Sequence, residues 1–400
     1  MTGREVWITG VGLLTCLGED AASHHDKLMG THDTGTIDAA AYAPYPIHPL
    51  GQIDYARQIP KKSDQRQMEL WQRIGVYSAG LALADAGLAH DAPLLSRTHL
   101  IVAAGSGERD TAVDTKILES IGESCDTELL AKEVLPTALR PTLFLAQLSN
   151  LLAGNISIVH NVTASSRTFM GEEMAGLAAL ENAHRRIMGG QGEVFLVGGA
   201  LNAEREDLLL GYELGRNLWP HAYAPVWSRR AQGGGFIPGS AGAFLVVEAR
   251  EHAEARGRTP YARIRDVVTD RCRRKPGETS ATLNDLFGKL AAEPGALAVL
   301  SGASGAEPAT SEELAFLQGL KDLGHQVSIR AYGSRIGHSV EAHFPVGVCL
   351  AALALAKGAF YAPSGDNQVE TPFDDAPSRV LVTGVGHWRG EGLALIERVP

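Results

Sequence analysis

Short apolar runs alternate with longer segments of helical spacing along most of the chain. Nine of these runs are strand-like. They are Glu5–Ile8, His99–Ala103, Asn155–His160, Glu193–Val197, Ala241–Glu248, Tyr261–Val267, Ala296–Leu300, Gln326–Arg330 and Val380–Thr383. Between them, Val76–Gly87 has helical spacing and closes on a glycine, which is a good C-terminal stop for a helix. Strands that alternate with helices predict an α/β fold.

The two ends of the chain carry the same short pattern. Val6–Gly12 reads VWITGVG and Val380–Gly386 reads VLVTGVG, and each is a strand that runs into a Gly-x-Gly turn. This repetition favours two related halves. The charged, helix-forming stretch Arg250–Arg258 lies where the first half would pass to the second. We therefore place the boundary at Gly257, which divides the chain into residues 1–257 and 258–400.

Composition and charge limit the partners that the chain can take. Its 400 residues are 44% hydrophobic and 20% charged, which is enough for a substantial core. The formal net charge of −10 argues against nucleic acid and anionic membranes as partners. Met1–Val11 lacks a basic leader followed by a long apolar stretch, so we expect a cytoplasmic protein. Val346–Ala356 is shorter than the roughly 20 residues of a spanning helix, and we expect a buried core helix and no membrane span.

The four cysteines are far apart in the sequence. They are Cys16, Cys125, Cys272 and Cys349, and no two of them form a CxxC pair. This spacing disfavours a zinc site and a disulfide framework. We therefore expect packing or surface thiols, no metal and no cofactor.

Six stretches follow one another in the order found in one enzyme family. They are VWITGVGLLTCLGED at Val6–Asp20, LALADAGL at Leu81–Leu88, Gly198–Ala200, GFIPGSAGAFLVVE at Gly235–Glu248, Arg258–Ile264 and GHSVEA at Gly337–Ala342. Together they resemble the β-ketoacyl-acyl-carrier-protein synthases, which are condensing enzymes. The resemblance implies a thiolase-like fold, in which two similar βαβαβ halves pack as five alternating αβαβα layers. It also implies a cysteine nucleophile, two histidines that bind the malonyl thioester carbonyl, and a supporting lysine.

The segment Gly154–Glu172 is similar to the family's nucleophile turn, but its cysteine is missing. An ungapped alignment from Gly154 to Gly171–Glu172 puts Thr163 at the cysteine's place, and an alignment with one gap puts Ser165 there. A hydroxyl offers almost no anion at neutral pH, whereas cysteine supplies a thiolate. The prediction is therefore a turn without a thiol, in which Thr163 holds the nucleophile position and Ser165 lies close enough to contact substrate.

The resemblance also gives places for the other catalytic groups. Ser304 stands where the family has its first histidine, and a serine cannot supply the imidazole that polarises a carbonyl. His338 stands at the second histidine. The lysine's place falls on Gly333, and Arg335 lies two positions later. The family's gating phenylalanine corresponds to His387 or Trp388, which we expect to shape a substrate pocket.

The changes at three catalytic positions predict a protein that does not condense by itself, because residues that act together fail together. The leading hypothesis is a non-catalytic subunit of fatty-acid or polyketide elongation, similar to the chain-length-factor subunits that pair with an active synthase. The alternative is an acyltransferase or thioester hydrolase that uses Thr163 or Ser165 and an oxyanion hole of backbone N–H groups. A third hypothesis is a homodimer that binds an acyl chain without chemistry.

The expected partners follow from the same resemblance. An active synthase would load the acyl-carrier protein and form a heterodimer with this chain, which alone would form a homodimer. In the family the strand before the nucleophile pairs across the dimer axis, and that strand is expected at Asn155–His160. Such a dimer would bury well over the roughly 2,000 Å² of an obligate interface.

Overall fold

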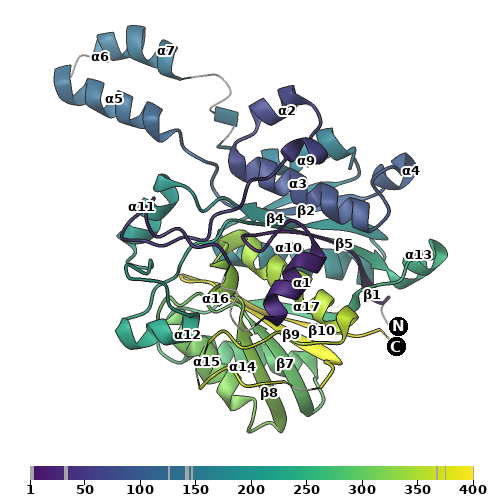
Figure 1. Cartoon of the computed structure of the whole chain (residues 1–400). Coiled ribbons are helices and arrows are strands. Elements are labelled where there is room, and N and C mark those ends of the chain that lie inside the picture. Colours follow the sequence, from purple (N-terminus) through teal and green to yellow (C-terminus); the bar gives the residue numbers. More distant parts are fainter. Residues whose placement is uncertain are drawn as a thin grey trace.

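The computed structural model describes residues 4–30, 35–124, 127–139, 144, 145, 147–365, 368–373 and 375–399. In this part of the chain, ten strands form a mixed sheet in the order β3-β2-β4-β5-β1-β6-β10-β9-β7-β8 (Figure 1). The strands of the first half are β1 (Val6–Leu14), β2 (His99–Ala104), β3 (Ser166–Met170), β4 (Val194–Leu201) and β5 (Ala241–Ala249). Those of the second half are β6 (Ala262–Asp270), β7 (Gly295–Ser301), β8 (His325–Ala331), β9 (Arg379–Val385) and β10 (Glu391–Glu397).

The two halves of the sheet repeat one topology. The order β3-β2-β4-β5-β1 becomes β8-β7-β9-β10-β6 when each strand number is raised by five. The directions repeat as well, since β2 is parallel to β3 and β4, and β7 is parallel to β8 and β9. Only a short antiparallel pairing of Val6–Ile8 with Ala262–Ile264 joins the halves. The repeat breaks between β5 and β6, and the stretch between those strands contains Gly257, where the boundary is predicted.

The helices differ more between the halves than the strands do. Helices up to the end of the first half are α1 (Ala21–Met29), α2 (Lys62–Gln67), α3 (Leu70–Asp85), α4 (Ala92–Leu95), α5 (Thr111–Ser124), α6 (Thr127–Leu129), α7 (Leu135–Ala138), α9 (Leu151–His160), α10 (Glu172–Met188), α11 (Glu206–Leu214), α12 (Val226–Arg229) and α13 (Arg250–Ala255). Those of the second half are α14 (Glu278–Leu290), α15 (Ala309–Gly319), α16 (Gly333–Ile336) and α17 (His343–Lys357). Short turns of other helix types are η1 (Tyr55–Arg57), η2 (Leu130–Val134), η3 (Arg230–Gln232) and η4 (Val340–Ala342).

Helices and strands stack in five alternating layers. Helices α10 and α17 lie between the two halves of the sheet, since α10 contacts β2 and β6 and α17 contacts β5 and β9 (Figure 1). Helices α3 and α9 cover the outer face of the first half, and α14 and α15 cover that of the second. In the middle layer, α17 is strongly apolar and almost entirely buried. The segment Val340–Lys357 is the one described helix long and apolar enough to cross a membrane, and 89% of it is buried inside the protein.

The two glycines of the first Gly-x-Gly pattern, Gly10 and Gly12, lie inside β1 rather than in a turn after it. A Cβ at Gly10 would lie 2.5 Å from the carbonyl oxygen of Ala82, and one at Gly12 would lie 2.0 Å from that of Ser78. Only glycine therefore lets α3 approach the strand this closely. Of the predicted unpaired cysteines, Cys16 and Cys349 are buried and Cys272 is partly buried, while Cys125 lies outside the described residues.

The predicted strand Asn155–His160 is wrong, because this segment belongs to helix α9. Its alternating isoleucines are typical of a strand, but the buried residues Leu152, Ala153 and Ile156 follow helical spacing and face α3. The strand that leads into α10 is β3, whose sequence SRTFM is half exposed. Its polar composition fits its place at the edge of the sheet, where one side of the strand has no neighbouring strand among the described residues.

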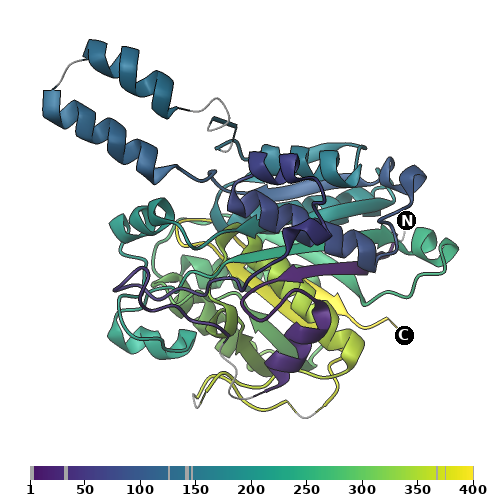
Figure 2. The same ribbon diagram turned by 45° about the horizontal axis from the view of Figure 1, so that its top comes forward.

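Helices α5, α6 and α7 form an arm that projects away from the layered body, as Figures 1 and 2 both show. The arm carries large apolar side chains that face solvent. Leu118 is 67% exposed, and Ile121 and Leu139 are each 44% exposed. Exposed apolar side chains on a projecting element are typical of a surface that contacts another protein chain.

Candidate functional site

The candidate site begins at the turn between β3 and α10. Gly171 has a φ of 112°, and Glu172, a residue with a side chain, has a φ of 28°. Such values are rare outside glycine and mark a sharp, over-determined change of direction. The turn carries Glu173 into the interior, where 3% of the residue is exposed. A strand-to-helix turn thus presents a carboxylate at the start of a buried helix, where the helix dipole favours negative charge.

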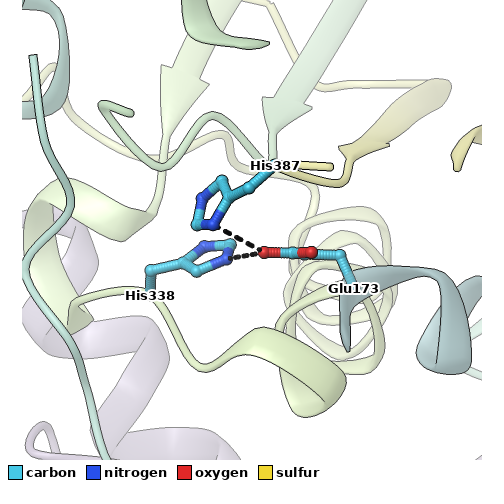
Figure 3. Close-up of side chains that lie close together, drawn as sticks. All are labelled: Glu173, His338 and His387. Atoms are coloured by element: carbon cyan, nitrogen blue, oxygen red, sulfur yellow. Dashed lines mark hydrogen bonds and ion pairs between the residues drawn. The ribbon is translucent and has the colours of Figure 1, made fainter. Parts of the chain in front are cut away.

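Two histidines from distant parts of the chain meet this carboxylate (Figure 3). Glu173 Oε1 lies 3.0 Å from Nε2 of His338 and 3.3 Å from Nδ1 of His387. On its other side, His387 Nε2 lies 2.8 Å from Oγ of Ser304. His338 follows α16, His387 follows β9, and Ser304 follows β7. Glu173, His338, His387 and Ser304, which we call the cluster, are all buried. They lie at the ends of strands and helices from both halves of the chain.

Aromatic rings close the cluster. The ring of His343, at the start of α17, has its centroid 4.1 Å from that of His338. Phe236 packs against both cluster histidines, with centroid distances of 5.4 Å to His338 and 4.9 Å to His387. These contacts exclude water from the imidazoles and hold their planes in place.

Burial and charge set the protonation of the cluster. Burial raises the pKa of Glu173, but the charges of His387 and His338 and a hydrogen bond with His338 outweigh burial and lower that pKa to about 2. Burial lowers the pKa of His387 to about 4. Burial raises the pKa of Glu341, on the neighbouring turn η4, to about 7. At neutral pH the cluster therefore holds an ionised Glu173 beside a neutral His387.

A cavity of about 370 Å³ opens beside the cluster. Its lining residues are Gly105, Ser106, Met170, Gly171, Glu172, Asp207, Leu208, Gly211, Tyr212, Glu341 and Trp388. The Trp388 ring stacks on that of Tyr212 at a centroid distance of 5.4 Å and is the half-exposed aromatic residue of the wall. Glu341 is buried, and its Oε2 atom has no hydrogen-bond partner. The cavity is thus lined by Glu172 and Trp388, which are the chain neighbours of Glu173 and His387.

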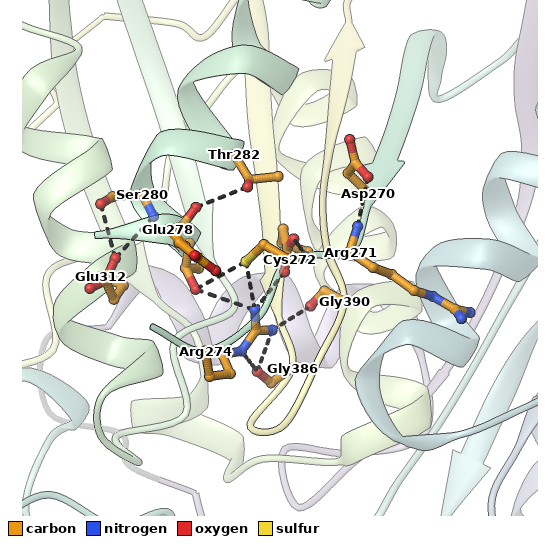
Figure 4. Close-up of polar contacts among 12 residues, drawn as sticks. Asp270, Arg271, Cys272, Arg274, Glu278, Ser280, Thr282, Glu312, Gly386 and Gly390 are labelled. Carbon is orange, nitrogen blue, oxygen red and sulfur yellow. Dashed lines mark hydrogen bonds and ion pairs between the residues drawn. The ribbon is translucent and has the colours of Figure 1, made fainter. Parts of the chain in front are cut away.

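Arg274 holds the turn that carries His387 and Trp388 (Figure 4). Its guanidinium donates to the carbonyl oxygens of Gly386 and Gly390 at 2.8 and 3.1 Å, and to Glu391 at 2.8 Å. The Glu391 side chain is fully buried. A bidentate, partly buried arginine of this kind fixes backbone and carboxylate geometry together.

The structure brings together three of the predicted site residues, since Ser304, His338 and His387 share the cluster. Of the two residues predicted for the gate position, Trp388 lines the adjacent cavity and His387 contacts Ser304. Gly333, at the predicted place of the lysine, has no side chain, and a Cβ there would lie 3.6 Å from Cε1 of His343.

Arg335 does not take the place of that lysine. Its guanidinium donates to Ser364 Oγ at 3.0 Å and to the carbonyl oxygen of Gly30 at 3.1 Å. These bonds fix the side chain within a network around the Gly30 and Ser364 loops.

Thr163 and Ser165 lie elsewhere, and the predicted nucleophile position needs a correction. Thr163 is exposed, and its N–H group donates to the carbonyl oxygen of Leu95. Ser165 is also exposed, with Oγ 2.7 Å from Nδ1 of His99. Both precede β3, whereas Glu173 follows it, and the five residues of β3 span roughly 16 Å. The alignment failed because α9 was taken for the strand that leads into the turn.

Glu173 and Glu341 are the candidate-site residues that the sequence interpretation missed. Gly171–Glu172 served only as an alignment anchor. The available signal was Gly171 followed by two carboxylates at the start of an apolar helical pattern, which marks a strand-to-helix turn. The buried partners of Glu173 could not be read from that signal, because they lie more than 160 positions away.

Comparisons with known proteins identify the family and the fold. The family described as Beta-ketoacyl synthase, N-terminal domain, matches residues 3–253. The chain is 26% identical over 273 residues to 3-oxoacyl-[acyl-carrier-protein] synthase 2 of Vibrio harveyi, a match that covers 66% of this chain and 62% of that protein. The chain thus matches less than two thirds of the length of this curated relative.

Solved structures show the same fold. The ishigamide ketosynthase/chain length factor superposes with a TM-score of 0.81 at 18% identity and covers 100% of both chains. A type II PKS acyl-carrier protein in complex with its ketosynthase has a TM-score of 0.74 at 17% identity, over 99% of this chain and 100% of that chain. The predicted α/β fold of the thiolase-like kind, and the resemblance on which it rests, are confirmed.

Proposed function

We propose that this chain, which belongs to the β-ketoacyl synthase family, serves fatty-acid or polyketide chain elongation as a non-catalytic subunit that pairs with an active synthase. One observation carries the proposal. The strand-to-helix turn presents the Glu173 carboxylate to His338, where a condensing enzyme needs a thiol. A carboxylate has no sulfur atom and cannot form the thioester that a cysteine forms with an acyl chain.

The surroundings of Glu173 support the same conclusion. Ser304 offers a hydroxyl in the place of the first histidine, and its Oγ is engaged with His387 and with the N–H group of Ala306. Gly333 leaves the lysine's place without a side chain. Decarboxylation of a malonyl thioester needs groups that stabilise the developing enolate, and two of the three that the family provides are absent here.

The free edge of β3 is the surface that we assign to the partner synthase. It replaces the predicted strand Asn155–His160 in that role, because β3 is the first strand of the sheet order. Beside it, α9 exposes Ile158 by 69%, and β3 itself exposes Met170 by 70%. An unpaired edge flanked by apolar side chains can extend across a two-fold axis into a second sheet. We propose a homodimer for the chain alone and a heterodimer with an active synthase that loads acyl-carrier protein.

The alternative, an acyltransferase or hydrolase, draws on the contact between Ser165 and His99. A serine within hydrogen-bond reach of an imidazole is the first requirement of a hydroxyl nucleophile. This pair is exposed, however, and Arg186 donates to the same Ser165 Oγ at 3.3 Å, so the hydroxyl belongs to a surface hydrogen-bond network. The cavity described above does not include either residue.

The test combines the chain with a cysteine-bearing synthase and acyl-carrier protein from its own source. We expect a 1:1 complex, an acyl adduct on the synthase alone in intact-mass spectra, and a change in product length when this chain is added. The chain alone should give no adduct and no ketoacyl product. A stoichiometric adduct on this chain that disappears in Ser165→Ala, with Thr163→Ala as the matched control, would instead establish the alternative.

A further inference from the structure

His338 and His387 each direct one ring nitrogen toward the same carboxylate oxygen of Glu173, so three potential ligand atoms lie close together (Figure 3). We propose that they form a binding site for a divalent first-row transition metal ion, of which Zn²⁺ is the probe of choice. This inference replaces the expectation of no metal, which rested on cysteine spacing alone. It does not depend on the proposed function, because a metal could bind whether or not the chain pairs with a synthase.

The distances between the ligand atoms suit such an ion. Oε1 of Glu173, Nε2 of His338 and Nδ1 of His387 all lie within 4.8 Å of one another. Oε1 of Glu173 lies 3.0 Å from Nε2 of His338 and 3.3 Å from Nδ1 of His387. A tetrahedral ion with bonds of about 2.0–2.1 Å has ligand atoms roughly 3.3 Å apart. Small side-chain rotations therefore bring all three atoms into the first coordination shell.

The buried negative charge of Glu173 also favours the binding of a cation. Glu173 is 3% exposed, and within the described residues its ion pairs are those with the two histidines, none with lysine or arginine. A second buried carboxylate, Glu341, lies close enough for Glu173 to act on it electrostatically. Buried carboxylates are normally paired or bound to metal, since an unpaired buried charge is costly. A divalent ion would supply the missing positive charge.

The atoms around the ligands are arranged as they are in metal sites. His387 uses Nε2 to contact Ser304 Oγ at 2.8 Å, which leaves Nδ1 free to bind an ion. The buried atoms Glu173 Oε2 and His338 Nδ1 have no hydrogen-bond partner in the part of the chain that the structure describes. Oε2 could thus provide a second bond from the same carboxylate. Within the described part of the chain, this is the only group of three metal-ligating side chains so close together.

The adjacent cavity comes near the proposed site through the chain neighbours of two ligands. Glu172 and Trp388, which line the cavity, are the chain neighbours of Glu173 and His387. Three protein ligands leave one position of a tetrahedral ion open, as in catalytic zinc sites of the two-histidine, one-glutamate kind. The open position would face the side from which the cavity approaches, so a small oxygen ligand such as water or a carbonyl group would complete the coordination.

The experiment uses the untagged full-length chain, freed of metal with a chelator and titrated with Zn²⁺ and Co²⁺. We expect one ion per chain in isothermal titration and in metal analysis, and an intense visible Co²⁺ spectrum of a four-coordinate site. Glu173→Gln and His387→Gln should each weaken binding at least about a hundredfold. Exposed residues of the same types serve as matched controls, and His90→Gln and Glu251→Gln should leave the affinity unchanged.

One further variant keeps the test decisive if a ligand variant does not fold. Ser304→Ala keeps all three ligands but removes the contact that orients His387, and it should weaken binding roughly tenfold. Circular dichroism establishes that each variant is folded before titration. Two results would overturn the proposal: no stoichiometric binding by the unmodified chain, or binding that persists unchanged in folded Glu173→Gln and His387→Gln, which would place the ion elsewhere.

Discussion

Nε2 of His338 lies 3.0 Å from Oε1 of Glu173, although 165 positions separate the two residues in the sequence. This contact identifies residue 173 as the place where a side chain meets the histidine that the family resemblance singles out. It also shows why Thr163, at the other end of β3, cannot do so.

The first prediction introduces a thiol at each of these two places. Glu173→Cys should form a covalent acyl adduct when it is mixed with acyl-carrier protein that carries an acyl chain, because His338 can assist thiolate formation. It should still form no ketoacyl product, since Ser304 and Gly333 leave the decarboxylation groups missing. Thr163→Cys, an exposed thiol, should form no enzymatic adduct. Intact-mass spectrometry measures both, and condensation by Glu173→Cys alone would show that His338 suffices.

The second prediction concerns the edge formed by β3 and α9. Ile158→Asp places a carboxylate on an exposed position of α9, so the monomer should remain folded. If β3 and α9 lie in a dimer interface, burial of that charge should weaken dimerisation at least about a hundredfold. Light scattering at micromolar concentration should then report a monomer. Leu323→Asp, at a 54% exposed residue of the second half, is the control and should remain dimeric.

The third prediction is a loss of stability in mild acid. Burial lowers the pKa of His24 to about 4, and burial together with the charge of Arg229 lowers that of His48 to about 3. In the unfolded chain both take up a proton near pH 6.5. Between about pH 6.5 and 4 the unfolded state therefore binds more protons, and the free energy of unfolding falls as the pH falls.

Urea unfolding at a series of pH values measures this slope. Each histidine should contribute up to about 1.4 kcal/mol per pH unit. His24→Gln should lower the number of protons taken up on unfolding between pH 6 and 4.5 by about one, which lowers the slope of the unfolding free energy against pH. His90→Gln, at an exposed residue, should not change that slope. An identical slope in His24→Gln would mean that this histidine is already protonated in the folded protein.

The fourth prediction tests the arginine that holds the His387 turn. Arg274→Met leaves the carboxylate of Glu391 buried without its cation, and removal of one partner of a buried pair costs about 3–5 kcal/mol. Urea unfolding should show a loss of this size. The exposed neighbour Arg273→Met should change stability by less than about 0.5 kcal/mol. The double variant Arg274→Met with Glu391→Gln should recover part of the loss, and no recovery would contradict the ion pair as the cause.

The sequence by itself determined the α/β class, the related halves and the family, because these depend on local patterns. Runs such as His99–Ala103 and Val380–Thr383 are strands in the structure, and the apolar segment Val346–Ala356 lies in the buried helix α17. Ser304 and His338 could be placed because short glycine-containing motifs flank them. Local patterns of this kind can be recognised even at low overall sequence identity, because burial and backbone conformation constrain each position separately.

Only the tertiary structure decided which strand precedes the turn and what Glu173 meets. Asn155–His160 has the alternation of a strand but forms a helix against α3, while the polar segment Ser166–Met170 forms the edge strand. Local propensity is weak where packing against a neighbouring element dominates the free energy. The cluster of Glu173, His338 and His387 joins three strand and helix ends that no spacing relates, because the order of strands in the sheet, and not the order of residues in the chain, determines which side chains share a buried site.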